Sequence, residues 1–322
     1  MDTLVIIPDW GRLKRVGAES HLQARAPGRP SANGSGPERW ELIDWRTHQS
    51  WVSIEGHAIN TIQLGEGPAI LFIHGLSGCW PNWLEQLCPF ATTNRVIAVD
   101  LPGFGHSPGS GGEISMEGYA RLLDGLLAHL GLARATVVGN SMGGLIAAEM
   151  AAAYPERVER LVLISAAGMS TYRDRLTRRT MPAVRRLDRL LALGAAWSAA
   201  NSDSITRRPR GRELALKGVM RHPARLSPQL AAEQVRGAGT DGFIGALEAI
   251  VEYDVRDRLP LISCPTLIVW GTNDRLISVR DAERFAAGIK GSRRVIYADT
   301  GHTAMLERPR EFNRLLREFL DG

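Results

Sequence analysis

A serine stands between two glycines where a strand pattern gives way to a helix pattern. Ser141 follows the apolar run ATVV and precedes LIAAEMAAAYPERV, with Gly139 and Gly143 two residues away on either side. A sharp strand-to-helix turn holds its serine in a strained backbone conformation, and side chains at those two positions would collide with neighbouring backbone. A simple helix-starting turn would use the same residues, so the rest of the chain must decide whether this serine is a nucleophile.

A carboxylate and a histidine follow later in the chain, each at the end of an apolar strand pattern. Asp274 follows LIVWGTN, and His302 follows VIYADTG. The carboxyl ends of parallel strands meet at one rim of a sheet, where ligands bind, so these side chains are expected to lie near the serine. Serine, acid and histidine in this order predict a triad in which the histidine takes the serine proton. Asp100 and Asp299 are weaker candidates for the acid.

Two backbone amides are expected to stabilise the negative oxygen that forms when a serine attacks a carbonyl. The amide of Met142 lies at the start of the helix, and the amide of Leu76 follows the strand LFIHG. His74, in that HG pair, is expected to shape the loop. Trp80 and Trp83 follow closely and are candidates for lining the substrate pocket, with a core position weighed equally.

The elements that must position these residues alternate between strands and helices. SWVSIEG and HAINTIQLG predict an antiparallel hairpin with a tight turn at Glu55 and Gly56. Helix patterns such as SMEGYARLLDGLLAHLGL separate the later strands, which predicts right-handed crossovers. The expected fold is α/β, a mostly parallel eight-stranded sheet with helices on both faces. Continuous apolar runs, typical of buried parallel strands, open AILFIHG and RVIAVDLPGFG. ATVVGNS and VERLVLISAAG are also expected as buried strands, and PTLIVWGTND and RRVIYADTGH as later strands.

A long stretch without a convincing strand interrupts this alternation. It contains helix patterns such as AVRRLDRLLALGAAW, and an insertion of this kind leaving the sheet at its carboxyl end would cover the site. We therefore expect four segments: an N-terminal arm or linker at residues 1–40, a first part of the core at 41–168, a helical cap at 169–256 and a second part of the core at 257–322.

The composition is that of a globular enzyme, with 322 residues of which 44% are hydrophobic and 23% charged. No apolar run approaches the roughly 18 residues of a membrane-spanning helix, so no stable membrane insertion is expected. The start has an acid at Asp2 and no basic lead, which favours a cytoplasmic protein. Three scattered cysteines, Cys79, Cys88 and Cys264, are too few for a disulfide framework or a zinc site.

The predicted cap carries most of the positive charge. Residues 169–236 hold 14 Arg and 1 Lys against 3 Asp and 2 Glu, while the whole chain has a net charge of +5. Such a block can attract nucleic acid or an anionic membrane surface. It lacks interleaved aromatic residues and any nucleic-acid motif, which favours a solvated basic face and no nucleic-acid partner.

Five motifs together identify a family resemblance. HGLSG, DLPGFGHS, GNSMGG, GTND and TGH resemble the α/β-hydrolase fold superfamily from about residue 51 onwards, and the helical insertion resembles that superfamily's cap. The resemblance implies a serine hydrolase that needs no metal or organic cofactor. It also implies that Ser141, Asp274 and His302 form the triad and that Leu76 and Met142 form the oxyanion hole.

The same motifs bear on the bond that is cleaved. The loop after HG resembles that of esterases, which predicts hydrolysis of small-molecule carboxylic esters with small to medium acyl chains through an acyl-enzyme. GNSMGG resembles hydrolases that cleave carbon–carbon bonds in ring-fission products. Those usually have a tryptophan after the catalytic histidine, where this chain has Thr303, and a glycine-richer loop where it has Leu76 and Ser77. A ligand receptor that retains the triad, an interfacial lipase and a perhydrolase-like side activity are further alternatives.

Overall fold

The computed structural model describes residues 39–109, 115–169, 194, 196–237 and 242–322. The chain divides into two compact units, residues 1–47 and residues 48–322. Most of the arm expected at residues 1–40 lies outside the described residues. Two short 3₁₀ helices precede the first strand: η2 (Arg39–Leu42), and η3 (Trp45–His48), whose last residue is the first of the second unit. The Trp45 indole N–H donates to the Trp40 carbonyl at 3.0 Å.

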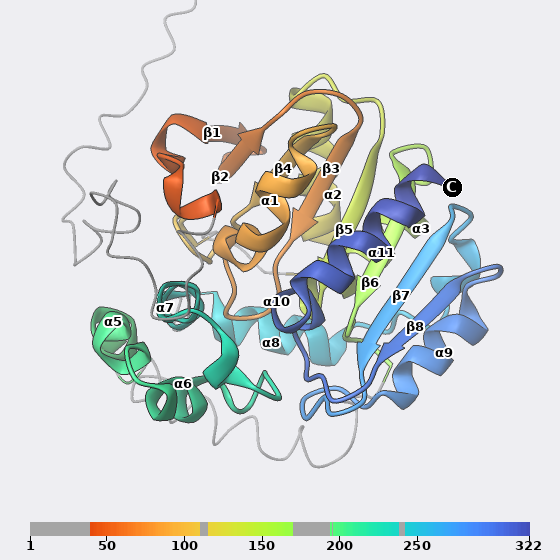
Figure 1. Ribbon diagram of the computed structural model, residues 1–322. Helices are drawn as coiled ribbons and strands as arrows, with labels where there is room; N and C mark the ends of the chain where they lie inside the picture. The colour runs from red at the N-terminus through yellow and green to blue at the C-terminus, as the bar shows by residue number, and fades with distance from the viewer. Residues whose placement is uncertain (1–38, 110–114, 170–193, 195, 238–241) are drawn as a thin grey trace, which may run out of the picture. The chain divides into compact units, whose positions relative to one another are not determined.

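One eight-stranded sheet organises the second unit, in the order β1-β2-β4-β3-β5-β6-β7-β8 (Figure 1). β2 pairs antiparallel with both β1 and β4, and the pairs from β4 to β8 are parallel. This confirms the predicted mostly parallel sheet. The strands are β1 (Gln49–Ile54), β2 (His57–Leu64), β3 (Ala69–Ile73), β4 (Arg95–Val99), β5 (Ala135–Asn140), β6 (Val158–Ile164), β7 (Thr266–Gly271) and β8 (Arg293–Tyr297).

The hairpin between β1 and β2 turns at the two residues that the sequence predicted. Glu55 has φ 49° and Gly56 has φ 83°, and Ile54 pairs directly with His57. Positive φ at both central residues is the geometry of a two-residue turn whose twist matches that of the flanking strands.

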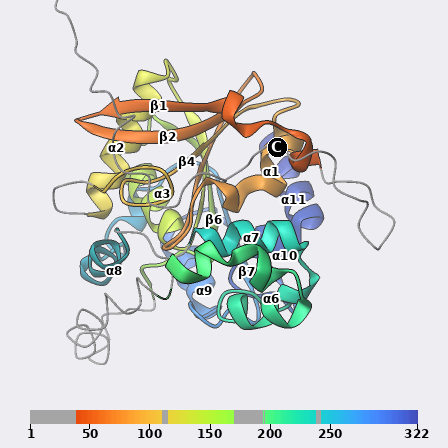
Figure 2. The same ribbon diagram turned by 90° about the vertical axis from the view of Figure 1, so that its left-hand side faces the viewer.

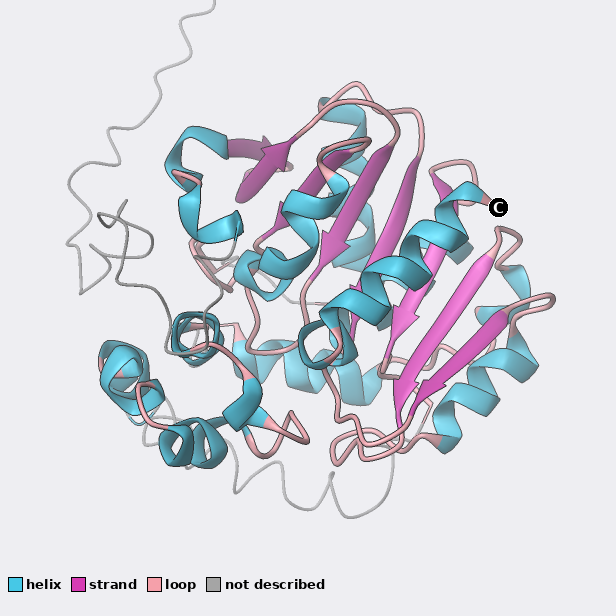
Figure 3. Ribbon diagram, in the orientation of Figure 1, coloured by secondary structure: helices cyan, strands magenta, loops and turns pink. Residues whose placement is uncertain are grey.

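Helices cover both faces of the sheet (Figure 1 and Figure 3), with α1 and α11 on one face and α2 and α3 on the other. Central strand residues such as Leu71, Val137 and Ile268 are therefore fully buried, which explains their continuous apolar runs. The core helices are η4 (Trp80–Trp83), α1 (Leu84–Phe90), α2 (Met116–His129), α3 (Met142–Ala153), α9 (Arg280–Gly288), α10 (Ala304–Glu307) and α11 (Pro309–Asp321).

Between β6 and β7 lies an insertion whose described part contains helices and connecting turns and no strand. Figure 1 places its helices beyond the ends to which the arrowheads of the parallel strands point, and Figure 2 shows them from the side. Most of the helix pattern AVRRLDRLLALGAAW, residues 183–197, lies outside the described residues, and its described end at 194 and 196–197 is helical. None of the described helices has the length and apolar character needed to cross a membrane. The elements of the insertion and its exit are α5 (Ser202–Thr206), α6 (Pro209–Leu216), η5 (Pro223–Arg225), α7 (Pro228–Arg236), α8 (Phe243–Glu252) and η6 (Leu259–Leu261).

Candidate active site

Ser141 forms a sharp turn between β5 and α3. Its backbone has φ 58° and ψ −118°, a region that non-glycine residues rarely adopt and that costs free energy. The Ser141 amide donates to the Ile164 carbonyl of the neighbouring strand at 2.9 Å, and its own carbonyl accepts from Leu145 and Ala167. The surrounding hydrogen bonds therefore hold the strained residue in place, as the sequence predicted for a nucleophile.

The two glycines around Ser141 are required because other backbone segments lie against them. A Cβ on Gly139 would lie 2.1 Å from the Gly143 carbonyl oxygen. A Cβ on Gly143 would lie 2.3 Å from the Ile73 oxygen and 2.5 Å from the His74 oxygen. These separations are far below van der Waals contact, so β3, β5 and the start of α3 can meet here only without side chains. The physical reason inferred from the sequence is thus present in the structure.

Asp274 and His302 lie in the loops after β7 and β8 and bond directly to each other. The distance from His302 Nδ1 to Asp274 Oδ2 is 2.8 Å, and both side chains are almost wholly buried. The other carboxylate oxygen, Oδ1, accepts from the amides of Leu276 and Ile277 at 2.9 and 3.0 Å. Both oxygens of the Asp274 carboxylate thus accept hydrogen bonds. Because Oδ2 binds Nδ1, Nε2 of His302 is available to act as a base.

Ser141 and His302 both line one cavity of about 580 Å³. Asn140, directly before Ser141, links the serine turn to the His302 loop. Its side-chain amide donates to the His302 carbonyl at 3.3 Å and to the Ile164 carbonyl of β6 at 3.0 Å. Among the described residues no direct hydrogen bond links Ser141 Oγ to His302. Such contacts often tighten only when substrate is bound. The structure therefore brings the three predicted triad residues to one rim of the sheet.

The predicted oxyanion loop is fixed by a buried histidine. His74 Nδ1 lies 2.8 Å from the Gly75 carbonyl oxygen, and His74 Nε2 accepts from the Leu101 amide at 3.0 Å. Burial lowers the pKa of His74, although Asp100 opposes this effect. A neutral ring can donate from one nitrogen and accept at the other. The ring thus holds the backbone just before Leu76, which lines the cavity, and the expected role of His74 as a loop-shaping residue is fulfilled.

Asp100, a weaker candidate for the acid, forms hydrogen bonds away from His302. Its fully buried carboxylate accepts from the Trp80 amide at 2.7 Å, the Asn60 side-chain amide at 2.8 Å and the His106 amide at 2.9 Å. Burial alone would raise the pKa of Asp100, but hydrogen bonding from His106 and the other donors lowers it overall. Asp100 therefore joins the loops after β3 and β4. Asp299, the other weaker candidate, pairs with Arg221 and His222 of the insertion between β6 and β7, which we call the cap from here on.

The two tryptophans proposed to line the pocket do not do so. Trp80 and Trp83 are 3% and 0% exposed, and neither lines the cavity. The Trp83 ring packs on Phe72 with centroids 4.9 Å apart. Both side chains on this short helix are buried in the core, so of the two positions weighed equally the structure has the core position and not the pocket position. Asn82, between them, does line the cavity and donates to Gln234 of α7 at 2.5 Å.

The cap supplies most of the apolar cavity wall. No lysine, arginine, aspartate or glutamate is among the lining residues that the structure describes. Sequence reasoning missed this wall because its residues belong to separate cap helices with no motif. The cap residues of the wall include Leu216, Val219, Met220, Val235, Leu247 and Ile250.

The described residues contain no cluster of three or more histidine, cysteine or acidic side chains that could hold a metal ion. Cys79 is buried, Cys88 and Cys264 are partly buried, and none of the three forms a disulfide.

Known proteins resemble this chain over most of its length. Residues 68–309 match the model of the alpha/beta hydrolase fold. The 2-hydroxy-6-oxo-6-phenylhexa-2,4-dienoate hydrolase of Comamonas testosteroni is 29% identical over 279 residues, covering 80% of this chain and 89% of that protein. The 2-hydroxy-6-oxononadienedioate/2-hydroxy-6-oxononatrienedioate hydrolase of Klebsiella pneumoniae subsp. pneumoniae is 31% identical over 272 residues, covering 80% and 84%. A thermophilic esterase from Thermogutta terrifontis has a TM-score of 0.68 at 27% identity, covering 85% of this chain and 98% of that structure.

Proposed function

Because this chain belongs to the alpha/beta hydrolase fold family, we propose that it is a serine hydrolase whose nucleophile is Ser141. The observation that carries the proposal is the strained Ser141 on the rim of a cavity that His302 also lines, with His302 bonded to the buried Asp274. The strained turn at Ser141 can form without a hydrogen-bonded histidine and aspartate nearby. A histidine at the same cavity, bonded to a buried aspartate, therefore supports a catalytic role.

The proposed reaction follows from these positions. His302 Nε2 takes the Ser141 proton as Oγ attacks a carbonyl carbon, and Asp274 stabilises the imidazolium that forms. The carbonyl oxygen becomes negative, and the amides of Met142 and Leu76 donate to it. His302 then gives its proton to the leaving group. Water, activated in the same way, releases the acyl group and restores Ser141.

Two classes of substrate fit this chemistry, and the relatives support a carbon–carbon bond more directly than an ester. Both curated relatives described above are named for hydrolysis of 2-hydroxy-6-oxo dienoates or related acids. In such a substrate the carbonyl attacked is a ketone, and the leaving group is a carbon atom that takes the bonding electron pair and then a proton. We therefore place hydrolysis of a carbon–carbon bond beside a ketone first.

Ester hydrolysis is the second candidate, and the chemistry of the cavity favours it. Dienoate substrates carry a carboxylate, and a buried carboxylate needs a positive or hydrogen-bonding partner. The described lining residues include no arginine or lysine. A neutral ester with an apolar acyl chain would require none. The structural similarity to the Thermogutta terrifontis esterase supports the same substrate class.

One panel of assays separates these candidates. Wild type and Ser141→Ala would be given p-nitrophenyl acetate, p-nitrophenyl butyrate and 2-hydroxy-6-oxo-6-phenylhexa-2,4-dienoate, at equal protein concentrations. We expect multiple turnovers of at least one substrate by wild type and a loss of about a thousandfold or more in the variant. Faster kcat/KM on the dienoate supports the first candidate, and faster kcat/KM on the esters supports the second. Turnover that survives in Ser141→Ala refutes the proposal, and a single product per site indicates a receptor.

A further inference from the structure

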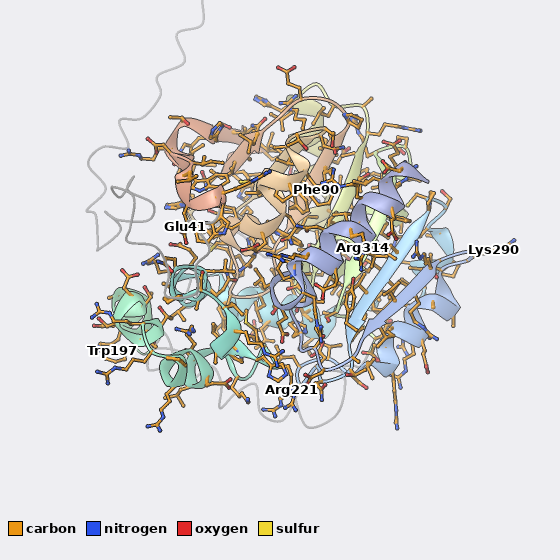
Figure 4. The ribbon with its side chains drawn as sticks, viewed as in Figure 1. Glu41, Phe90, Trp197, Arg221, Lys290 and Arg314 are labelled. Carbon is orange, nitrogen blue, oxygen red and sulfur yellow. The ribbon has the colours of Figure 1, made fainter. Side chains whose placement is uncertain are left out.

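A backbone hydrogen bond joins the cap to the loop that carries His302. The His302 amide donates to the Val219 carbonyl at 2.9 Å. Val219 and Met220, in the turn after α6, also line the cavity beside His302. Figure 4 labels Arg221 where this part of the cap reaches the loops at the ends of β7 and β8. One short cap segment thus contacts both the cavity and the backbone of the predicted base.

A single carboxylate bridges the two segments at this place. Glu307, the last residue of α10, accepts from the Gly301 amide through Oε1 at 2.8 Å. Its Oε2 accepts from the Arg221 amide at 2.8 Å and the His222 amide at 3.3 Å. One donor therefore precedes His302 directly in the chain, and the other two belong to the cap.

The two segments approach each other closely at Gly301. A Cβ on Gly301 would lie 2.7 Å from the Arg221 nitrogen and 2.7 Å from Glu307 Oε1. Backbone therefore lies directly against backbone, with only the carboxylate between the donors. Any loss of this carboxylate would leave three N–H groups facing one another at close range, with no acceptor between them.

The charge of Glu307 suits it to this arrangement. Hydrogen bonds from N–H groups to a carboxylate are roughly twice as strong as bonds to neutral acceptors. Burial raises the pKa of Glu307, and the amides of Arg221, Gly301 and His222 oppose that rise. A glutamine at this position would offer one oxygen and one NH₂ group, so it would place a donor against a donor on one side.

We propose that Glu307 is a positioning residue that fixes the His302 loop against the cap, so that the base and the cavity wall keep one mutual geometry. The inference rests on the proposed function, because it assigns Glu307 an effect on catalysis through His302. A displacement of about 1 Å in a reacting group can cost about a hundredfold in rate. A carboxylate that holds both segments is therefore expected to affect turnover without touching the substrate.

A neighbouring acid provides a matched control. Asp299 pairs with the side chains of Arg221 and His222, at 3.0 Å to Arg221 Nε and 2.7 Å to His222 Nε2. Its side chain is 49% exposed, and ion pairs at that exposure contribute little to stability. Asp299 links cap to core by side chains alone, whereas Glu307 bonds to their backbones. Asp299→Asn removes the ion pairs between side chains and leaves intact the hydrogen bonds that Glu307 accepts from the backbone amides.

The kinetic test compares Glu307→Gln, Asp299→Asn and wild type. Active sites would be counted by labelling Ser141 with phenylmethylsulfonyl fluoride and measuring intact mass. We expect kcat per labelled site and the labelling rate to fall about tenfold or more in Glu307→Gln and to stay within about twofold in Asp299→Asn. Wild-type values per labelled site in Glu307→Gln would overturn the inference, because a purely structural role changes only the number of folded sites. An equal loss in Asp299→Asn would also overturn it.

Hydrogen–deuterium exchange provides a test that needs no substrate. We expect faster exchange at Arg221, His222, Gly301 and His302 in Glu307→Gln, with peptides from β3 and β5 unchanged. Exchange equal to that of wild type at these four amides would overturn the inference whatever the activity. If Ser141→Ala retains turnover, the proposed function fails instead, and the exchange result still decides whether Glu307 holds the loop.

Discussion

Replacing Gly143 by alanine tests whether the close approach of three backbone segments positions the nucleophile. The new Cβ would lie 2.3 Å from the Ile73 carbonyl oxygen and 2.5 Å from that of His74. Close carbon–oxygen contacts are normally about 3.3 Å or longer, so the end of β3 and the start of α3 would have to separate by about 1 Å. That displacement moves Ser141 relative to the loop that carries the Leu76 amide.

We expect Gly143→Ala to lower kcat/KM by about a hundredfold, because a displacement of about 1 Å in a reacting group costs that much. Overpacking at this site should also lower the free energy of unfolding by about 1–3 kcal/mol. Steady-state kinetics and urea unfolding would measure the two effects. Gly109→Ala is the control, because a Cβ there meets no atom of the described residues within 4 Å. A Gly143→Ala enzyme with wild-type kcat/KM would refute the positional argument.

Two further substitutions test the electrostatics of the site and the cap. Asp274→Asn should lower kcat by about ten-thousandfold, since the amide no longer holds the imidazole in the required tautomer; stopped-time product assays would measure the loss, and a decrease below tenfold would contradict the assignment. Glu233 of α7 has its pKa raised to about 7 from an ordinary 4.5, chiefly by burial, with Arg236 opposing the rise. The folded protein binds this proton more tightly than the unfolded chain, so the contribution of Glu233 to stability falls as pH rises from about 4.5 to 7. From pH 5 to pH 8 the free energy of unfolding of wild type should fall by about 1–3 kcal/mol relative to that of Glu233→Gln, as measured by urea unfolding at both pH values. Parallel pH profiles of the two proteins would contradict this.

The elements that carry the site could be predicted because each depends on local sequence. The apolar runs of the central strands are fully buried in the sheet, and burial on both faces requires such runs. Ser115 is the N-cap of α2, a preferred residue type there, and its hydroxyl accepts from the Gly118 amide at 3.0 Å. The strained conformation of Ser141 similarly requires glycines at fixed spacing, so the motif indicates the turn directly.

The predictions that failed or were never made concern contacts between segments far apart in the chain. Trp80 and Trp83 lie close to the oxyanion loop in sequence, but the direction of their side chains depends on how η4 packs on the sheet. The apolar wall depends on which sides of α6, α7 and α8 face the core. No periodicity in a single helix pattern specifies that choice.

The sequence by itself determined the strands, the turn that strains Ser141 and the order of nucleophile, acid and base, because short-range steric and apolar requirements leave a pattern in consecutive residues. Only the tertiary structure decided what surrounds them. Glu307 shows the difference, since its carboxylate accepts from Gly301 six residues away and from Arg221 eighty-six residues away. A bond of the second kind depends on the folded path of the whole chain, which no local pattern records.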